Sequence, residues 1–163
     1  MAKNKEEKTN VMRVLEQKKI AYTPHSYPHE EGVAVDGVTV AQSMGFDPAI
    51  VFKTLVARGA SKQYYVFDVP VAENLDLKKA AKAVGEKSIE MIHQKELLPL
   101  TGYVHGGCSP VGMKKLFPTV FHSSAENLAA MIVSAGKIGY QFELAPHDLA
   151  ALVRAKFADI IVE

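Results

Sequence analysis

The stretch Ile50-Val51-Phe52-Lys53-Thr54-Leu55-Val56-Ala57-Arg58 is rich in β-branched and aromatic residues, which favour an extended strand over a helix. Side chains alternate across a strand, and both faces of this one are apolar, so the stretch predicts a central strand. Lys53 is the exception, because it would point among aliphatic neighbours. Its ammonium would there meet an anion or have its pKa driven down. Alternatively, the strand lies at a sheet edge and Lys53 reaches water. Spacing alone leaves both interpretations open.

The rest of the chain alternates between short helices and short strands. A turn at residues 59–62 followed by the run 64–69 predicts an antiparallel partner for the central strand, and a turn at 136–139 joins a second hairpin. Prolines 24 and 28 place the strand at 21–27 at an edge or a cleft wall. The pattern indicates an α+β fold, with a mixed, largely antiparallel sheet or partial barrel flanked by helices. The other strands are predicted at 89–92, 120–122, 131–134 and 140–144, and the helices at 10–20, 39–45, 77–84, 94–98, 123–130 and 145–153.

Local signals set the expected ends of these helices. Asp76 is a predicted N-cap and Gly85 a predicted end for the helix 77–84. Thr39 to Gln42 and Ser123 to Glu126 have the spacing of capping boxes, and Pro99 is expected to stop the helical turn that precedes it.

Length and composition fit one compact domain. The chain has 163 residues, 48% hydrophobic and 23% charged, so we expect a flexible N-terminus over residues 1–9 and a single domain over residues 10–163. With a net charge of +1, nucleic-acid binding would need a local basic patch. The densest one is Lys78, Lys79 and Lys82, with Lys87 just beyond. This surface is either a solvated helix face or a contact for RNA phosphates.

Several kinds of chemistry are poorly supported. Cys108 is the single cysteine, so no internal disulfide forms, and no apolar run is long enough for a membrane span or a targeting segment, which suits a reducing cytoplasm. His25 and His29 are four residues apart, but no further ligand completes a metal set, so we expect no metal. Phosphate-binding and dinucleotide-binding glycine motifs are absent, and we expect no cofactor.

A glycine-rich run over residues 101–112 offers two interpretations. Gly106 and Gly107 could present backbone N–H groups to a carbonyl or phosphate, or could form a plain bulge. Cys108 beside them could be a nucleophile, with His105 or His122 as its base, although a small buried hydrophobe is the commoner role. Two serines, Ser109 and Ser134, could orient a substrate or satisfy backbone groups in their turns.

Four segments together resemble one family. They are Phe52-Lys53-Thr54-Leu55, then Leu75-Asp76-Leu77-Lys78-Lys79-Ala80-Ala81-Lys82, then Gly102-Tyr103 with Gly106-Gly107 and Ser109-Pro110-Val111-Gly112, and finally Val133-Ser134-Ala135-Gly136-Lys137. In this order they resemble the YbaK/EbsC family over roughly residues 10–159. Its members are free-standing aminoacyl-tRNA deacylases related to the editing domain of bacterial prolyl-tRNA synthetases.

The resemblance implies a function and a set of site residues. It implies hydrolysis of mischarged Cys-tRNA(Pro), with some action on Cys-tRNA(Cys), in the cytoplasm and without a metal. Lys53 would be the catalytic residue. Prolyl-tRNA synthetase would be a partner, because a free-standing editor must find its tRNA. The substrate-binding residues would be Tyr27, Thr54, Gly106, Gly107 and Ser134.

The family mechanism accounts for the missing nucleophile. The cysteinyl thiol is expected to attack its own ester carbonyl and release a cyclic thiolactone, so the protein need only bind, orient and stabilise charge. Two departures from the family pattern, Asp36-Gly37 and Gln141, leave the amino-acid preference open. The alternatives are a deacylase of Ala-tRNA(Pro) or another mischarged tRNA, and a non-catalytic module that binds tRNA or a synthetase.

Overall fold

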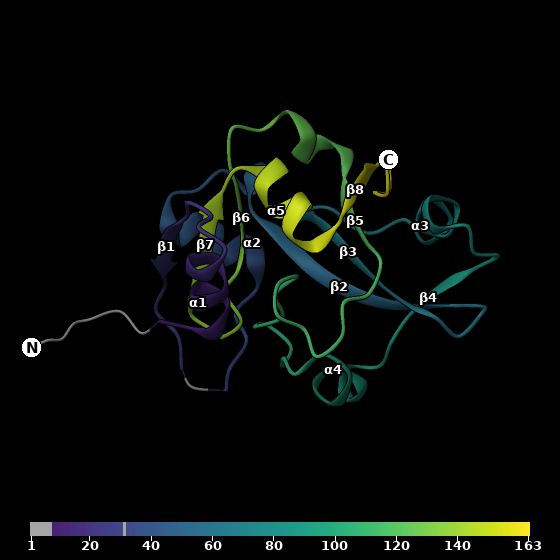
Figure 1. Cartoon of the computed structure of the whole chain (residues 1–163), viewed down its shortest axis with the longest axis horizontal. Helices are drawn as coiled ribbons and strands as arrows, with labels where there is room; N and C mark the ends of the chain where they lie inside the picture. The colour runs from purple at the N-terminus through teal and green to yellow at the C-terminus, as the bar shows by residue number, and fades with distance from the viewer. Residues whose placement is uncertain (1–7, 31) are drawn as a thin grey trace, which may run out of the picture.

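The computed structural model describes residues 8–30 and 32–163, which form two open sheets (Figure 1). The first is antiparallel, with strand order β1-β7-β6 (Thr23–Ser26, Tyr140–Leu144 and Met131–Ser134). The second is mixed, with order β4-β2-β3-β5-β8 (Ile89–Met91, Phe52–Gly59, Tyr64–Pro70, Thr119–His122 and Lys156–Ala158). Within it, β5 runs parallel to both of its neighbours. These sheets confirm the predicted α+β class, and neither closes into a barrel.

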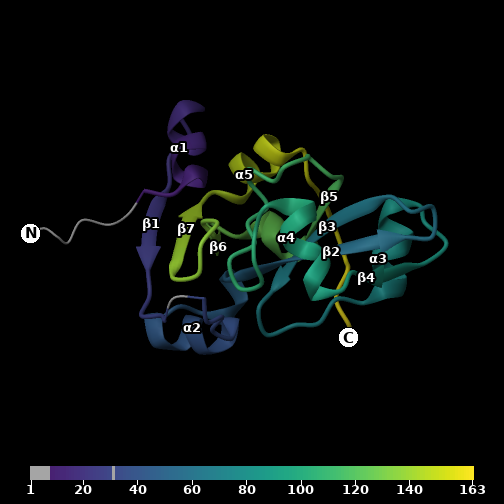
Figure 2. The same cartoon turned by 90° about the horizontal axis from the view of Figure 1, so that it is seen from below.

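The helices lie around the sheets. They are α1 (Asn10–Gln17), α2 (Gly37–Met44), α3 (Leu77–Val84), α4 (Gln94–Thr101) and α5 (Pro146–Val153), with 3-10 turns at Pro48–Ile50 and Ser123–Asn127. Figures 1 and 2 show α1 and α2 at the end of the molecule that holds the three-stranded sheet, and α3 at the opposite end. Both predicted hairpins form, and β1 is an edge strand as its prolines indicated.

Two predicted capping boxes are wrong. Helix α2 begins at Gly37, because the Asp36 carboxylate accepts a hydrogen bond from the Thr39 N–H group at 3.1 Å and so caps the helix earlier. Residues 123–127 form only a 3-10 turn after His122, which makes no side-chain cap bond. The chain then leaves the turn as extended backbone at Leu128, towards the buried strand β6, and no α-helix reaches residue 130.

The end of α4 also differs from the prediction, whereas the cap of α3 agrees with it. Pro99 does not stop α4, which runs to Thr101 and ends where Gly102 adopts a φ of 89°. A proline in the last turn removes one backbone donor without ending this helix, and the Thr101 hydroxyl group donates to the Leu97 carbonyl at 2.7 Å. Helix α3 has the predicted cap, since Asp76 accepts from the N–H groups of Lys78 and Lys79.

Helix α1 is capped by a residue that precedes the predicted helix. The Thr9 side chain accepts from the Met12 N–H group at 3.2 Å and caps α1, which ends at Gln17 and not at residue 20. Lys8 pairs with Glu16 at 2.9 Å. The rest of the segment predicted to be flexible, residues 1–7, lies outside the described residues.

Two apolar cores lie on the two faces of the larger sheet. Helices α1 and α5 pack with Phe142 of β7 and Phe52 of β2 in the first core. Helix α3 packs over Phe67 of β3 and Ala57 of β2 in the second. Strand β2 therefore contributes fully buried side chains to both cores, as its apolar pattern predicted.

Only part of β2 is flanked on both sides. Strand β3 pairs with it along its whole length, from Phe52 to Arg58, whereas β4 pairs with it only from Ala57 to Gly59. Just before β2, a single parallel bridge joins Val51 to Ile132 and links the two sheets. The half of β2 that carries Lys53 and Thr54 therefore has a free edge between the sheets.

Candidate active site

A cavity of about 540 Å³ opens at this free edge of β2. Its walls come from β2, the start of α2, the loop that contains Gly106, and the β6–β7 hairpin. Lys53 and Thr54 point to opposite faces of β2, yet both line the cavity because no strand covers the edge between them. The size is typical of a site for a small molecule or the end of a longer one.

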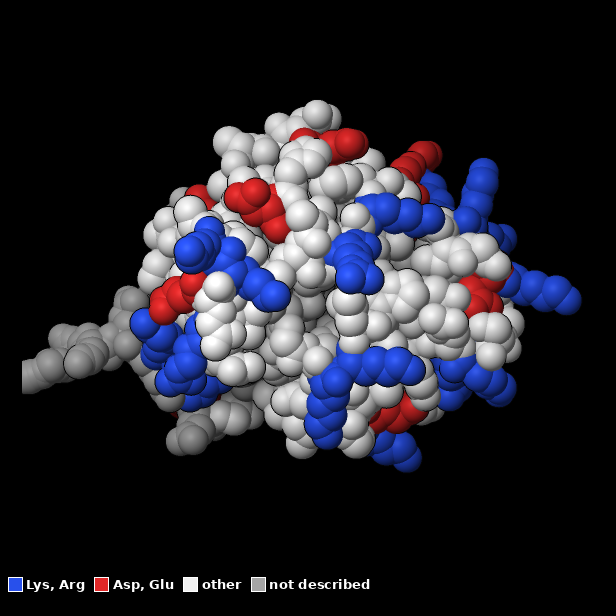
Figure 3. Space-filling view, viewed as in Figure 1, with Lys and Arg blue, Asp and Glu red and all other residues white. Residues whose placement is uncertain are grey.

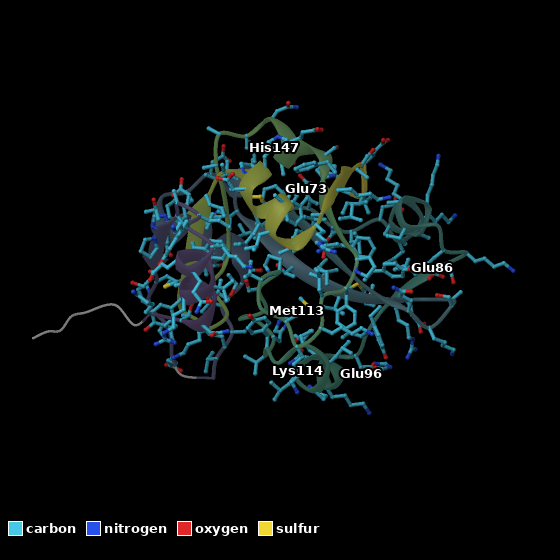
Figure 4. All side chains as sticks on the ribbon, viewed as in Figure 1. Glu73, Glu86, Glu96, Met113, Lys114 and His147 are labelled. Atoms are coloured by element: carbon cyan, nitrogen blue, oxygen red, sulfur yellow. The ribbon has the colours of Figure 1, made fainter. Side chains whose placement is uncertain are left out.

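Lys53 supplies positive charge to this cavity. Burial lowers the pKa of its ammonium group, while the negative charges of Asp36 and Glu73 oppose that shift. Figure 4 labels Glu73, in the segment after β3. Lys53 forms no hydrogen bond or ion pair within residues 8–30 and 32–163. Both predictions for Lys53 hold in part: the strand is interior, yet its lysine lies at a free edge and is only half-buried.

Thr54 lies between the cavity and a buried carboxyl group. Its hydroxyl group donates to Oδ1 of Asp68, which lies directly opposite on β3 and is completely buried. The second carboxyl oxygen, Oδ2, has no hydrogen-bond partner among the described residues. Burial raises the pKa of Asp68 to about 7, although the Thr54 hydrogen bond acts in the opposite direction.

The two departures from the family pattern both lie at the cavity. Asp36 lines it and contributes to the negative charge around Lys53, in addition to capping α2. Gln141 of β7 also lines it, is 8% exposed, and has an amide oxygen without a hydrogen-bond partner in the described part of the chain. At both positions a residue with an oxygen acceptor lines the cavity that contains the Lys53 ammonium group.

Tyr27, just after β1, and Ser134 of β6 come from opposite edges of the β1-β7-β6 sheet. The Tyr27 N–H group donates to the Gly139 carbonyl at 2.9 Å, which fixes this tyrosine beside the β6–β7 turn. The Ser134 oxygen accepts from the Gly136 N–H group at 3.1 Å, so the serine hydroxyl proton remains free to donate into the cavity. Ser134 thus satisfies a backbone group in its turn and also lines the cavity.

The two neighbouring glycines differ. Gly106 lines the cavity with a φ of 90°, and a Cβ atom there would lie 2.6 Å from the Ala34 Cβ atom, so only glycine fits. Gly107 does not line the cavity. Its N–H group donates to the Val104 carbonyl at 3.0 Å, and its Cα packs against the Lys137–Ile138 backbone. Of the two backbone N–H groups, that of Gly106 is the one left for a ligand.

Cys108 lines the cavity but is poorly suited to be a nucleophile. Burial, together with the negative charge of Asp68, raises the pKa of its thiol to about 12. His105 also lines the cavity, whereas the His122 ring accepts from the Ile160 N–H group elsewhere in the fold. Ser109 is fully buried and accepts from the Val111 N–H group. Cys108 is therefore best interpreted as a small buried side chain, the commoner role.

The basic patch of α3 is separate from this cavity. Lys79 is engaged by Asp159 at 3.1 Å and by the Ile161 carbonyl at 2.9 Å, so it ties α3 to the C-terminal segment. Lys78 and Lys82 border a second hollow of about 530 Å³. On the face shown in Figure 3, basic side chains are interspersed with acidic ones. The structure thus brings Lys53, Tyr27, Thr54, Gly106 and Ser134 together, and leaves Gly107 and the α3 lysines outside.

No cluster of three or more His, Cys, Asp or Glu side chains within the described residues could hold a metal ion. No described helix is long and apolar enough to cross a membrane.

Comparisons with known proteins show the class of protein to which this fold and cavity belong. The aminoacyl-tRNA editing domain matches residues 32–152. A protein of Enterococcus faecalis named as a Cys-tRNA(Pro)/Cys-tRNA(Cys) deacylase, EbsC, is 46% identical over 161 residues, which is 98% of each chain. The chain therefore belongs to the aminoacyl-tRNA editing domain family, and within it to the branch that contains EbsC.

Solved structures confirm the fold. A protein described as a trans-editing enzyme for prolyl tRNA synthetase superposes with a TM-score of 0.79 at 26% identity, over 94% of this chain and 95% of that one. The protein APE2540 superposes with a TM-score of 0.82 at 18% identity, over 93% of this chain and 99% of that one. Both superpositions span nearly the whole of this chain.

Proposed function

We propose that this protein removes cysteine from mischarged Cys-tRNA(Pro), and also acts on Cys-tRNA(Cys), in the cytoplasm. The observation that carries the proposal is the Lys53 ammonium group, which is unpaired among the described residues, in a cavity that also contains Tyr27, Gly106 and Ser134. The near full-length identity to the protein named as a Cys-tRNA deacylase supports the choice of amino acid.

The cavity can position an aminoacyl ester without attacking it. The Lys53 ammonium group would hold the phosphate, ribose or ester oxygen of the tRNA 3′ end, and would stabilise negative charge that develops on the ester. The Ser134 hydroxyl group and the Gly106 N–H group can donate hydrogen bonds to the same substrate. Since Cys108 is held as a thiol, the sulfur that attacks is the one that the substrate brings.

In the proposed reaction the substrate thiol loses its proton and its sulfur bonds to the ester carbonyl carbon. The bond from that carbon to the ribose oxygen then breaks, and the ribose oxygen takes a proton. The products are free tRNA and a cyclic thiolactone of cysteine, which water opens later. A free thiol has a pKa of about 8.5, so orientation supplies most of the rate increase.

The substrate is tested by deacylation of three charged tRNAs. We expect Cys-tRNA(Pro) and Cys-tRNA(Cys) to be emptied faster than in buffer alone, and Ala-tRNA(Pro) to remain charged, because alanine lacks the attacking sulfur. The measurement is the fraction of labelled amino acid that stays on tRNA over time. Loss of alanine at the cysteine rate would assign the cavity to another deacylase, and no loss from any of the three would leave a binding module.

A free-standing editor also needs to reach its tRNA, and we propose prolyl-tRNA synthetase as a partner in this encounter. Lys78 and Lys82 are the α3 lysines that remain available for phosphates, because Lys79 is engaged by the C-terminal segment. They form a candidate secondary contact that lies away from the cavity.

Replacing Lys78 and Lys82 together with glutamate should weaken tRNA binding and reduce the slope of log affinity against log salt by about 2, since each phosphate contact contributes about 1. Fluorescence anisotropy with labelled tRNA(Pro) at several salt concentrations measures this. Lys18 and Lys19, at the opposite end of the molecule after α1 (Figure 1), give a control with the same change in charge. An equal change in both double variants would rule out a specific contact at α3.

A further inference from the structure

Asp68 is the one Asp, Glu, Lys or Arg among the described residues whose side chain is buried in the core. It lies on β3, opposite Thr54 of β2 and Phe121 of the parallel strand β5. On the same face, Val66 packs with Val56, Cys108 and Phe117 in an apolar cluster. The neighbours of Asp68 on this face are apolar, so they would accept an apolar side chain at this position in place of the carboxyl group.

The surroundings do not compensate for burial of this carboxyl group. One oxygen receives the Thr54 hydroxyl proton, and the other has no partner in the described structure. An unpaired buried polar atom is costly, and such atoms in native proteins call for a functional explanation. The cavity that Thr54 lines, directly beside this carboxyl group, offers one.

The direction of the hydrogen bond between Thr54 and Asp68 decides whether Thr54 offers a donor or an acceptor to the cavity. An ionised carboxylate can only accept, so the Thr54 proton points at Asp68 and the lone pairs of the Thr54 oxygen are left for the cavity. In this state Thr54 presents an acceptor to the substrate. A thiol S–H group, which must lose its proton before its sulfur attacks, is a donor that suits this acceptor.

We propose that Asp68 is a positioning residue for the deacylation: it holds the Thr54 hydroxyl group as an acceptor for the substrate thiol and, through that hydroxyl group, takes up the proton that the thiol loses. This inference rests on the proposed function, because it assigns a proton route to the thiol-assisted reaction. The route ends on the Asp68 carboxyl group, which is completely buried behind Thr54.

The step balances without another reactant. The thiol proton moves to the Thr54 oxygen while the Thr54 proton moves to Asp68. The sulfur–carbon bond forms, the bond from carbon to ribose oxygen breaks, and the ribose oxygen takes a proton from the Lys53 ammonium group or from water. After the products leave, Asp68 returns its proton to solvent through Thr54, and Lys53 recovers its own.

The charges around Asp68 allow this exchange near neutral pH. Burial raises the pKa of the carboxyl group to about 7, so at pH 8 it is mostly ionised and at pH 6 mostly protonated. Cys108, from the glycine-rich loop, is the titratable group that faces it, and it stays a neutral thiol because its pKa is about 12. Thr54 from β2 and Phe121 from β5 carry no charge. The charges that act on Lys53 are those of Asp36 and Glu73, so Lys53 and Asp68 titrate separately.

The test is the pH dependence of single-turnover deacylation of Cys-tRNA(Pro) between pH 5.5 and 9. For the unchanged protein we expect the rate constant to rise with pH and level off above about pH 7, where Asp68 has ionised. Asp68→Asn should be about 10- to 100-fold slower at pH 8, with a rate that keeps rising towards pH 8.5, where the thiol itself ionises. The Kd for the charged tRNA should stay unchanged.

Three further variants separate proton transfer from folding. Thr54→Val removes the hydroxyl group at similar volume and should give the same altered profile, whereas Thr54→Ser should restore levelling near pH 7. Asp148→Asn, on the exposed side of α5, is the control for loss of one carboxylate and should keep the original profile.

The outcomes are distinct. If the unchanged protein cleaves Cys-tRNA(Pro) and both Asp68→Asn and Thr54→Val keep its rate and its levelling near pH 7, the role of Asp68 is overturned while the proposed function stands. If the unchanged protein leaves Cys-tRNA(Pro) charged, the proposed function fails, and the role of Asp68 fails with it.

Discussion

Replacing Lys53 with methionine should lower the single-turnover rate constant for Cys-tRNA(Pro) deacylation by about 10²- to 10³-fold, the usual cost of losing one group that stabilises transition-state charge. Methionine keeps most of the length of the side chain and its apolar stem, so the loss would report the ammonium group. The measurement is the decay of labelled Cys-tRNA(Pro) with enzyme in excess. Lys53→Ala should show a similar loss.

A matched control and a stability measurement make this result interpretable. Lys95→Met removes an exposed lysine from α4 and should keep the original rate. Burial lowers the pKa of Lys53, which means that the fold disfavours its charged form, so Lys53→Met should not reduce the free energy of unfolding. A Lys53→Met protein with the original rate would remove Lys53 from the mechanism.

Replacing Asp68 with asparagine should change the free energy of unfolding more favourably at pH 8 than at pH 5, when the variant is compared with the unchanged protein at the same pH. The folded-state pKa of Asp68 is about 7, above its ordinary value of 3.8. As the pH rises from about 4 to 7, the unfolded chain gives up this proton while the folded protein retains it, so the unchanged protein loses stability over this window. Between pH 5 and pH 8 the loss is about 3 kcal/mol, at about 1.4 kcal/mol for each pH unit up to the folded pKa.

Urea unfolding of both proteins at pH 5, 6.5 and 8 measures this difference. Asparagine does not ionise, so the gap between the two unfolding free energies should shift in favour of Asp68→Asn as the pH rises. Asp148→Asn, which removes an exposed carboxylate, is the control for general charge effects. A pH-independent gap for Asp68→Asn would mean that Asp68 is ionised throughout and is better solvated than its burial indicates.

The sequence predicted elements whose signals are local. The apolar alternation of residues 50–58, the glycine turn at 136–139 and the Asp76 cap each depend on residues within one element, and each prediction agrees with the structure. The missed strand β8 is different. It is a three-residue strand that forms only because β5 offers it a parallel edge, and its own residues give no strand signal.

The residues of the site divide in the same way, into those with a signal in the sequence and those whose role depends on the rest of the fold. Lys53 stood out because a lysine in an apolar strand is anomalous wherever the strand lies, and the family resemblance added Tyr27, Thr54, Gly106 and Ser134. Asp68 carried no such signal. Its proposed positioning role depends on the strand register that places Asp68 opposite Thr54. It also depends on the short strand β4, which leaves that part of β2 open to the cavity.

The most direct test of the central claim compares Cys-tRNA(Pro) with Ser-tRNA(Pro) under single-turnover conditions at pH 7.5. The two substrates differ by one atom, sulfur in place of oxygen, and an alcohol is a far weaker nucleophile than a thiol near neutral pH. If the substrate thiol is the nucleophile, the cysteinyl ester should be cleaved at least about 100-fold faster than the seryl ester. Equal rates on both esters would contradict the account, because water or a group of the protein would then have to attack.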